Sequence, residues 1–115
     1  MLPDNCFVSD KIEERSILMG DGSTQVLYFK HLANTAFERY AMWRRSEDEE
    51  IVASAHARLL TLGLCEPDGT AAITYERAVR IKMPVLVRLI NALLEVNAID
   101  TLESAVAAEA EQGKD

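Results

Sequence analysis

The sequence predicts an α+β fold that is mainly α, with an N-terminal β-hairpin packed on about four helices. Three observations predict it. Two segments that read as strands flank a Gly-Asp-Gly turn, residues with capping spacing precede stripes of helical period, and the most apolar run opens with a proline. A chain of 115 residues favours one domain with a real core. We expect a lead-in over 1–11, one globular domain over 12–98 and an acidic, Ala/Glu-rich tail over 99–115.

Residues 12–32 are expected to form the hairpin, because the Gly-Asp-Gly centre tolerates the positive φ of tight turns. The charges of the first arm suit the edge of a sheet. The second arm, 26–29, is apolar on both faces, so one face is expected to pack on the helices while the other needs a partner. Phe7 and Val8 of the lead-in are expected to dock on the body.

The helices follow from capping signals and apolar stripes. Asn34 or Thr35 is expected to cap the first helix. Thr35 with Glu38, and Ser46 with Glu49, have capping-box spacing, and Gly63 is a candidate C-cap. The helices are expected over 35–46, 47–63, 75–82 and 84–97.

The last of these helices, 84–97, is unusually apolar. At about 100° per residue, Arg88, Asn91 and Glu95 fall on one polar stripe, and apolar side chains cover roughly 200° of the rest. A surface helix needs an apolar arc of only about 100°. The helix is therefore either central to a small core or in contact with a second subunit as well.

Charge and composition exclude several classes of function. The formal net charge is -7 and the pI about 4.8, so the chain lacks the cationic surface that nucleic-acid binding requires. No apolar stretch approaches the roughly 20 residues that cross a bilayer, so no membrane role is expected. The N-terminus carries no signal-peptide pattern. Cys6 and Cys65 are expected to be reduced thiols of a cytosolic protein.

The residue types of an active site are present without a catalytic pattern. His31 and His56 belong to no metal-ligand motif, and no basic residue adjoins Cys65 to lower its pKa. Phosphate-binding and nucleophile-elbow motifs are absent. We therefore expect no enzyme, with no catalytic residue, no cofactor and no metal. The functional signal that remains is surplus apolar surface, which is typical of protein contact, although a good core would use the same residues.

Three stretches, taken with the order of elements, carry a resemblance. They are 22–39, 59–69 with its Leu-Cys-Glu-Pro-Asp-Gly turn, and 86–97, the leucine-rich helix that ends in Asn97. Together they resemble the tail assembly chaperones of long, non-contractile-tailed bacteriophages, in their short, non-frameshifted form.

The resemblance implies a function. Such chaperones act in the host cell cytoplasm and are absent from the mature virion. They bind the tape measure protein, keep it soluble and help recruit the tail tube protein through a longer form made by ribosomal frameshifting. The codons for Gln112, Gly113 and Lys114 can contain a slippery heptamer, which the nucleotide sequence would reveal.

Self-association is also expected, as a spiral or ring of copies along the tape measure protein. The expected contact joins the second hairpin arm to the outer side of the 84–97 helix, through Val26, Tyr28, Phe29, Val87, Ile90 and Leu94. The alternative interpretation is a small acidic helical adaptor or regulatory subunit that binds a basic protein partner.

Overall fold

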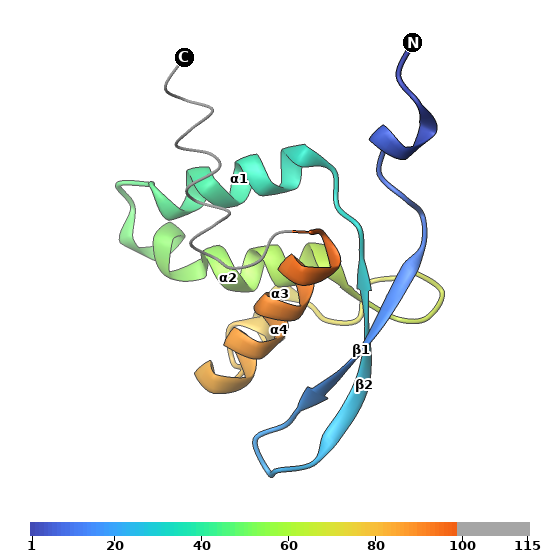
Figure 1. The fold of residues 1–115 in the computed structure, drawn as a ribbon. Helices are drawn as coiled ribbons and strands as arrows, with labels where there is room; N and C mark the ends of the chain where they lie inside the picture. Colours follow the sequence, from blue (N-terminus) through green and yellow to red (C-terminus); the bar gives the residue numbers. More distant parts are fainter. Residues whose placement is uncertain (99–115) are drawn as a thin grey trace.

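The computed structural model describes residues 1–98, and the predicted tail over 99–115 lies outside the described residues. Within 1–98, no helix is both long enough and apolar enough to span a membrane. The elements in chain order are a 3-10 turn η1 (Asp4–Cys6), strands β1 (Ile12–Leu18) and β2 (Thr24–Lys30), helices α1 (Asn34–Arg44) and α2 (Glu49–Gly63), strand β3 (Leu64–Cys65), and helices α3 (Tyr75–Ala78) and α4 (Met83–Val96). This order confirms the predicted α+β, mainly α fold (Figure 1).

The hairpin forms in the predicted place. Strands β1 and β2 pair antiparallel from Ile12 opposite Lys30 to Leu18 opposite Thr24. The turn closes with a 2.7 Å hydrogen bond from the Met19 N–H to the Ser23 carbonyl, and Gly22 has a φ of 88°. That φ lies in the left-handed region, which glycine enters without steric cost.

A third strand, β3, was missed in the sequence, where residues 64–65 read only as the approach to a turn. It pairs antiparallel with β2, placing Leu64 opposite Phe29 and Cys65 opposite Tyr28. Two residues are too few for an alternating pattern to appear. Because the strand order is β1-β2-β3, β2 is central and β1 lies at the edge, as its charges predicted.

The helix starts differ from the predicted capping boxes. Helix α1 is preceded by Ala33, which makes no side-chain cap, so the predicted cap at Asn34 or Thr35 is wrong. Helix α2 is capped by Asp48, whose carboxylate accepts a 2.9 Å hydrogen bond from the Glu50 N–H. Ser46 instead accepts from the Asp48 N–H and shapes the loop before the helix. Asp48 directly precedes the first residue of α2 and its side chain is a favoured N-cap, so it caps the helix in place of Ser46.

Helix α3 is shorter than predicted and ends at Ala78. The chain then makes a tight turn and becomes extended at Lys82 before α4 begins. Pro84 explains the break: a helix running on from α3 would need the N–H that proline lacks, and its ring would clash with the preceding turn. At the start of α4 the same proline is favourable, as predicted.

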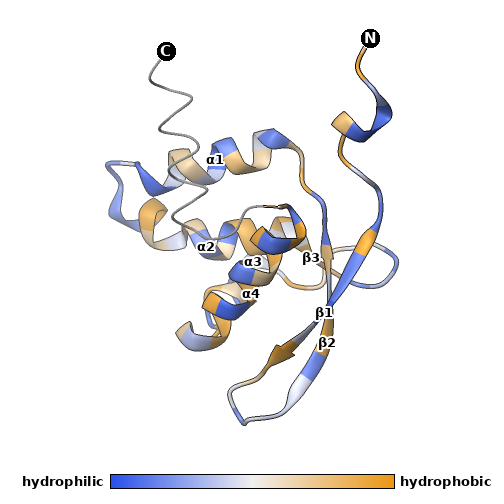
Figure 2. Cartoon of the chain, in the orientation of Figure 1, coloured by the Kyte–Doolittle hydropathy of each residue, from blue (hydrophilic) through white to orange (hydrophobic). Residues whose placement is uncertain are grey.

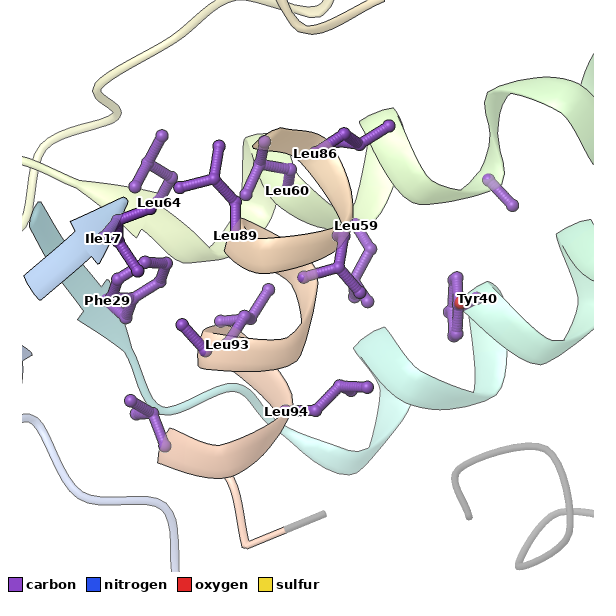
Figure 3. Packing of buried hydrophobic residues seen from close by; sticks show 14 residues of the cluster. Ile17, Phe29, Tyr40, Leu59, Leu60, Leu64, Leu86, Leu89, Leu93 and Leu94 are labelled. Carbon is purple, nitrogen blue, oxygen red and sulfur yellow. The ribbon is translucent and has the colours of Figure 1, made fainter. Parts of the chain in front are cut away.

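Helix α4 lies at the centre of the core, which is the first of the two alternatives that its wide apolar arc allowed. Figure 3 shows Leu89 on the side of Ile17 and Phe29 in the sheet, with Leu94 on the side of α1 and α2. The helix therefore has neighbours on two sides. The largest fully buried side chains are Phe29, Tyr40, Leu59, Leu60, Ile90, Leu93 and Leu94.

Gly63 was predicted as a C-cap, but it is the last residue of α2 and the cap is Leu64. Its role is close packing. A Cβ atom at Gly63 would lie 2.4 Å from Leu93 Cδ1 and 2.6 Å from Cδ2, nearer than real carbon atoms approach. The missing side chain thus allows α2 and α4 to come together.

Asn97 joins the end of α4 to the end of β2. Its side-chain carbonyl accepts a 2.7 Å hydrogen bond from the Leu32 N–H, and its amide donates to the carbonyls of Lys30 at 3.1 Å and Leu93 at 2.9 Å. One half-buried side chain therefore supplies hydrogen-bond partners to three backbone groups.

Asn97→Ala is expected to lower the free energy of unfolding by about 1–3 kcal/mol, because it leaves these partly buried backbone groups without protein partners. Urea denaturation followed by circular dichroism measures the change. Asn91→Ala, on the exposed side of the same helix, is the matched control and should stay within about 0.5 kcal/mol. Equal effects of the two substitutions would contradict the bridging role.

Candidate interaction surface

The six residues predicted for self-association divide into two groups. Val26 is 51% exposed, Val87 is 37% exposed and Tyr28 is half-buried. Phe29, Ile90 and Leu94 are each 0% exposed, so their expected place on an outer surface is wrong. The reason is that β3 pairs with β2 and α2 packs against α4, and neither contact was predicted from the sequence. The expected contact between copies remains a prediction, without these three side chains.

The outer face of the hairpin stays open to solvent. In the β1–β2 register, Ser16 lies opposite Val26 and Leu18 opposite Thr24, so Leu18 and Val26 project on the face away from the buried Ile17 and Phe29. Both are exposed. Figure 2 shows a hydrophobic segment at the end of β1, while the turn that follows it is pale to hydrophilic. This face has room for an apolar partner.

A second open surface surrounds α3 and the start of α4, and we call it the basic corner. It carries the exposed apolar side chains of Tyr75, Val79, Met83 and Val87, interleaved with the exposed cations Arg77, Arg80 and Lys82. None of these three cations forms an ion pair with another described residue. Ile73, Ile81, Arg77 and Arg80 line a hollow of about 440 Å³ there.

A third open surface is the N-terminal arm, residues 1–10, in which every residue is exposed. Phe7 is 64% exposed, so its predicted docking on the body is wrong. Val8 is 50% exposed and lines a hollow together with Lys30 and His31 of the body. The backbone hydrogen bonds of η1 are local, joining the Cys6 N–H to Pro3 and the Phe7 N–H to Asp4. The arm stands away from the helices in Figure 1.

A polar cluster lies between α1 and α2. Tyr40 Oη is 3.4 Å from His56 Nδ1, and Arg44 Nη1 lies 3.3 Å from Tyr40 Oη and 3.5 Å from His56 Nε2. Burial lowers the pKa of His56 and the Arg44 charge lowers it further, because both disfavour the imidazolium. Burial raises the pKa of Tyr40. The cluster therefore favours the neutral form of His56 in the folded chain.

The free energy of unfolding is expected to decrease as the pH is lowered, because His56 takes up a proton more readily in the unfolded chain. The folded pKa of His56 lies below the ordinary value of about 6.5, so the unfolded chain binds the proton first. The contribution to stability is complete above about pH 6.5 and decreases as the pH falls toward the folded pKa. Urea denaturation at a series of pH values should show a shallower acid decline for His56→Gln than for the wild type. An acid decline that stays unchanged in His56→Gln would contradict this assignment.

The other candidate reactive groups, His31, Asp68 and Cys65, lie outside this cluster and have different surroundings. His31 Nε2 lies 3.9 Å from Glu13 Oε1, while His31 and Asp68 both line a hollow of about 270 Å³. The Asp68 carboxylate accepts hydrogen bonds from the Thr70 N–H and hydroxyl, which lower its pKa. Cys65 is a free, buried thiol whose pKa burial raises. Within 1–98, no group of three or more His, Cys, Asp or Glu residues could hold a metal ion.

Comparisons of this chain with protein-family models, with curated proteins and with solved structures return no match.

The basic corner and the arm were not singled out as surfaces in the sequence, although signals for both exist. Tyr75, Val79, Met83 and Val87 recur every four residues, and cations fill the gaps between them. Residues 70–94 contain four Lys or Arg and one acid, in a chain of net charge -7. A local reversal of charge beside an apolar stripe marks such a surface.

Proposed function

We propose that this protein is a tail assembly chaperone of a long, non-contractile-tailed bacteriophage, acting in the host cytoplasm and absent from the mature virion. The observation that supports the proposal is exposed apolar surface at three separate places on a small acidic body. These places are the N-terminal arm, the outer face of the hairpin and the basic corner. Such surface on a small protein is typical of contact with other polypeptides.

The tape measure protein is the proposed client. It is long and largely helical, and its apolar faces have no partner before the tail tube surrounds it. The exposed Leu18 and Val26 of the hairpin offer apolar contact to one face of such a helix. The formal net charge of -7 keeps the resulting complex dispersed.

Two further partners complete the proposal. Copies of the chain associate with one another along the client, and a longer, frameshifted form recruits the tail tube protein. The residues expected at the slip site, Gln112, Gly113 and Lys114, lie outside the described residues. Sequencing the gene tests this part, because codons that break the slippery heptamer would remove it.

Co-expression with the tape measure protein proposed as the client tests the proposal. We expect the client to be soluble with this chain and insoluble without it. Val26→Asp, on the outer face of the hairpin, should lower the soluble fraction of the client. Gln25→Asp adds the same charge to the neighbouring residue of the strand, on the opposite face, and is the matched control. A client that stays insoluble with the wild-type chain would contradict the proposal.

The adaptor alternative has one observation in its favour. Glu47, Asp48, Glu49 and Glu50 are all exposed around the start of α2 and could meet a basic protein. Gene neighbourhood separates the two proposals. A tape measure gene downstream supports the chaperone, and a regulator or toxin gene supports the adaptor.

A further inference from the structure

The N-terminal arm and the basic corner have complementary chemistry. Residues 1–10 contain two aspartates, no lysine or arginine, and exposed Leu2, Phe7 and Val8. The corner offers two cations without an ion pair among the described residues, Arg77 and Arg80, in the lining of the hollow between Ile73 and Ile81. An acidic segment with apolar side chains therefore matches a basic surface whose hollow is lined by two isoleucines and two arginines.

The two surfaces lie at opposite ends of α4. The arm leaves the body at Ile12, which pairs with Lys30, and the Lys30 carbonyl is bonded to Asn97 at the C-terminal end of α4. The corner surrounds the N-terminal end of the same helix. With 14 residues, α4 is about 21 Å long. Figure 1 shows the arm pointing away from the start of α4, so the two surfaces of one chain do not meet.

We propose that the arm of one copy docks on the basic corner of a second copy. Phe7 enters the hollow beside Ile73 and Ile81, and the arm aspartates face Arg77 and Arg80. This inference rests on the self-association that the proposed function includes, and it names the contact. The contact is heterologous, because one copy contributes its arm and the other contributes its basic corner. Repetition therefore produces a ring if the rotation closes and a spiral if it does not.

Two variants, each with one surface damaged, test the contact in the full-length chain. Phe7→Asp changes only the arm, and the double substitution Arg77→Glu, Arg80→Glu changes only the corner. All three positions are exposed, and circular dichroism verifies the fold of both variants. In sedimentation velocity, each variant alone should be monomeric at concentrations where the wild type forms larger species. Met42→Asp, at an exposed apolar position of α1, is the matched control and should sediment as the wild type does.

Mixing the two variants gives the sharpest result. The intact arm of the corner variant can dock on the intact corner of the arm variant, but no further copy can add to that pair. An equimolar mixture should therefore form dimers and nothing larger. A monomeric wild type, wild-type assembly by either variant alone, or a mixture that stays monomeric would each overturn the proposed contact.

Client solubility separates this inference from the proposed function. If the wild type stays monomeric and still keeps the tape measure protein soluble, the arm contact is wrong and the chaperone function stands. If the variants behave as expected but the client remains insoluble with the wild type, the contact stands and the chaperone function is wrong.

Discussion

Replacing Phe29 by alanine is expected to lower the free energy of unfolding by about 3–5 kcal/mol, because the ring is fully buried in the sheet beneath α4. The loss is a large share of the roughly 5–15 kcal/mol that a small domain has. Urea denaturation of the purified variant measures it. A partly unfolded variant at room temperature is within the expected range.

Val26→Ala is the matched control for Phe29→Ala. Both residues lie on β2, and both were predicted to contact a second copy, but Val26 is exposed. Its substitution should change the free energy of unfolding by no more than about 0.5 kcal/mol. If Phe29→Ala were tolerated as well as Val26→Ala, the described burial of Phe29 would be contradicted.

Gly63→Val is expected to destabilise the fold by about 3 kcal/mol or more, because the first added carbon alone would overlap the buried Leu93 side chain. Leu93 lies in the core and has little room to move aside. Thermal and urea denaturation measure the loss. Gly22→Val is not a suitable control, because the positive φ of Gly22 adds strain of its own. Thr61→Val, two residues earlier in α2, is preferred as the control.

A double substitution tests the mechanism of that loss. Gly63→Val adds three carbon atoms and Leu93→Ala removes three at the point of contact. The double variant should therefore be more stable than the sum of the two single losses predicts, by about 1–3 kcal/mol. Strict additivity would show that the two residues do not share the space that the structure assigns to them.

Local signals predicted most of the fold. The Gly-Asp-Gly turn fixed the hairpin, and Pro84 marked the start of α4 to within one residue. Tertiary pairing was harder to predict. Strand β3 exists because β2 lies beside it, and Gly63 is required because Leu93 crosses α2 there. Neither neighbour is visible in a single sequence, since each comes from a distant part of the chain.

The surface was predicted less well than the core, for a related reason. The apolar arc of α4 shows how much of the helix surface is buried but not which element buries it. Ile90 and Leu94 were therefore predicted to contact a partner, whereas α2 and the sheet of the same chain bury them. The prediction for the N-terminal arm was wrong in the opposite sense, because a side chain that was expected to be buried is exposed. Phe7 was expected to pack because it is apolar, but its side chain is 64% exposed.

Hydrogen–deuterium exchange with and without the tape measure protein tests the central claim most directly, namely that the apolar surface left open by this small core binds other polypeptides. The account predicts slower exchange of the hairpin and of residues 73–87 in the presence of the client, with little change in the already buried centre of α4. Exchange unchanged along the whole chain when the client is present would contradict it.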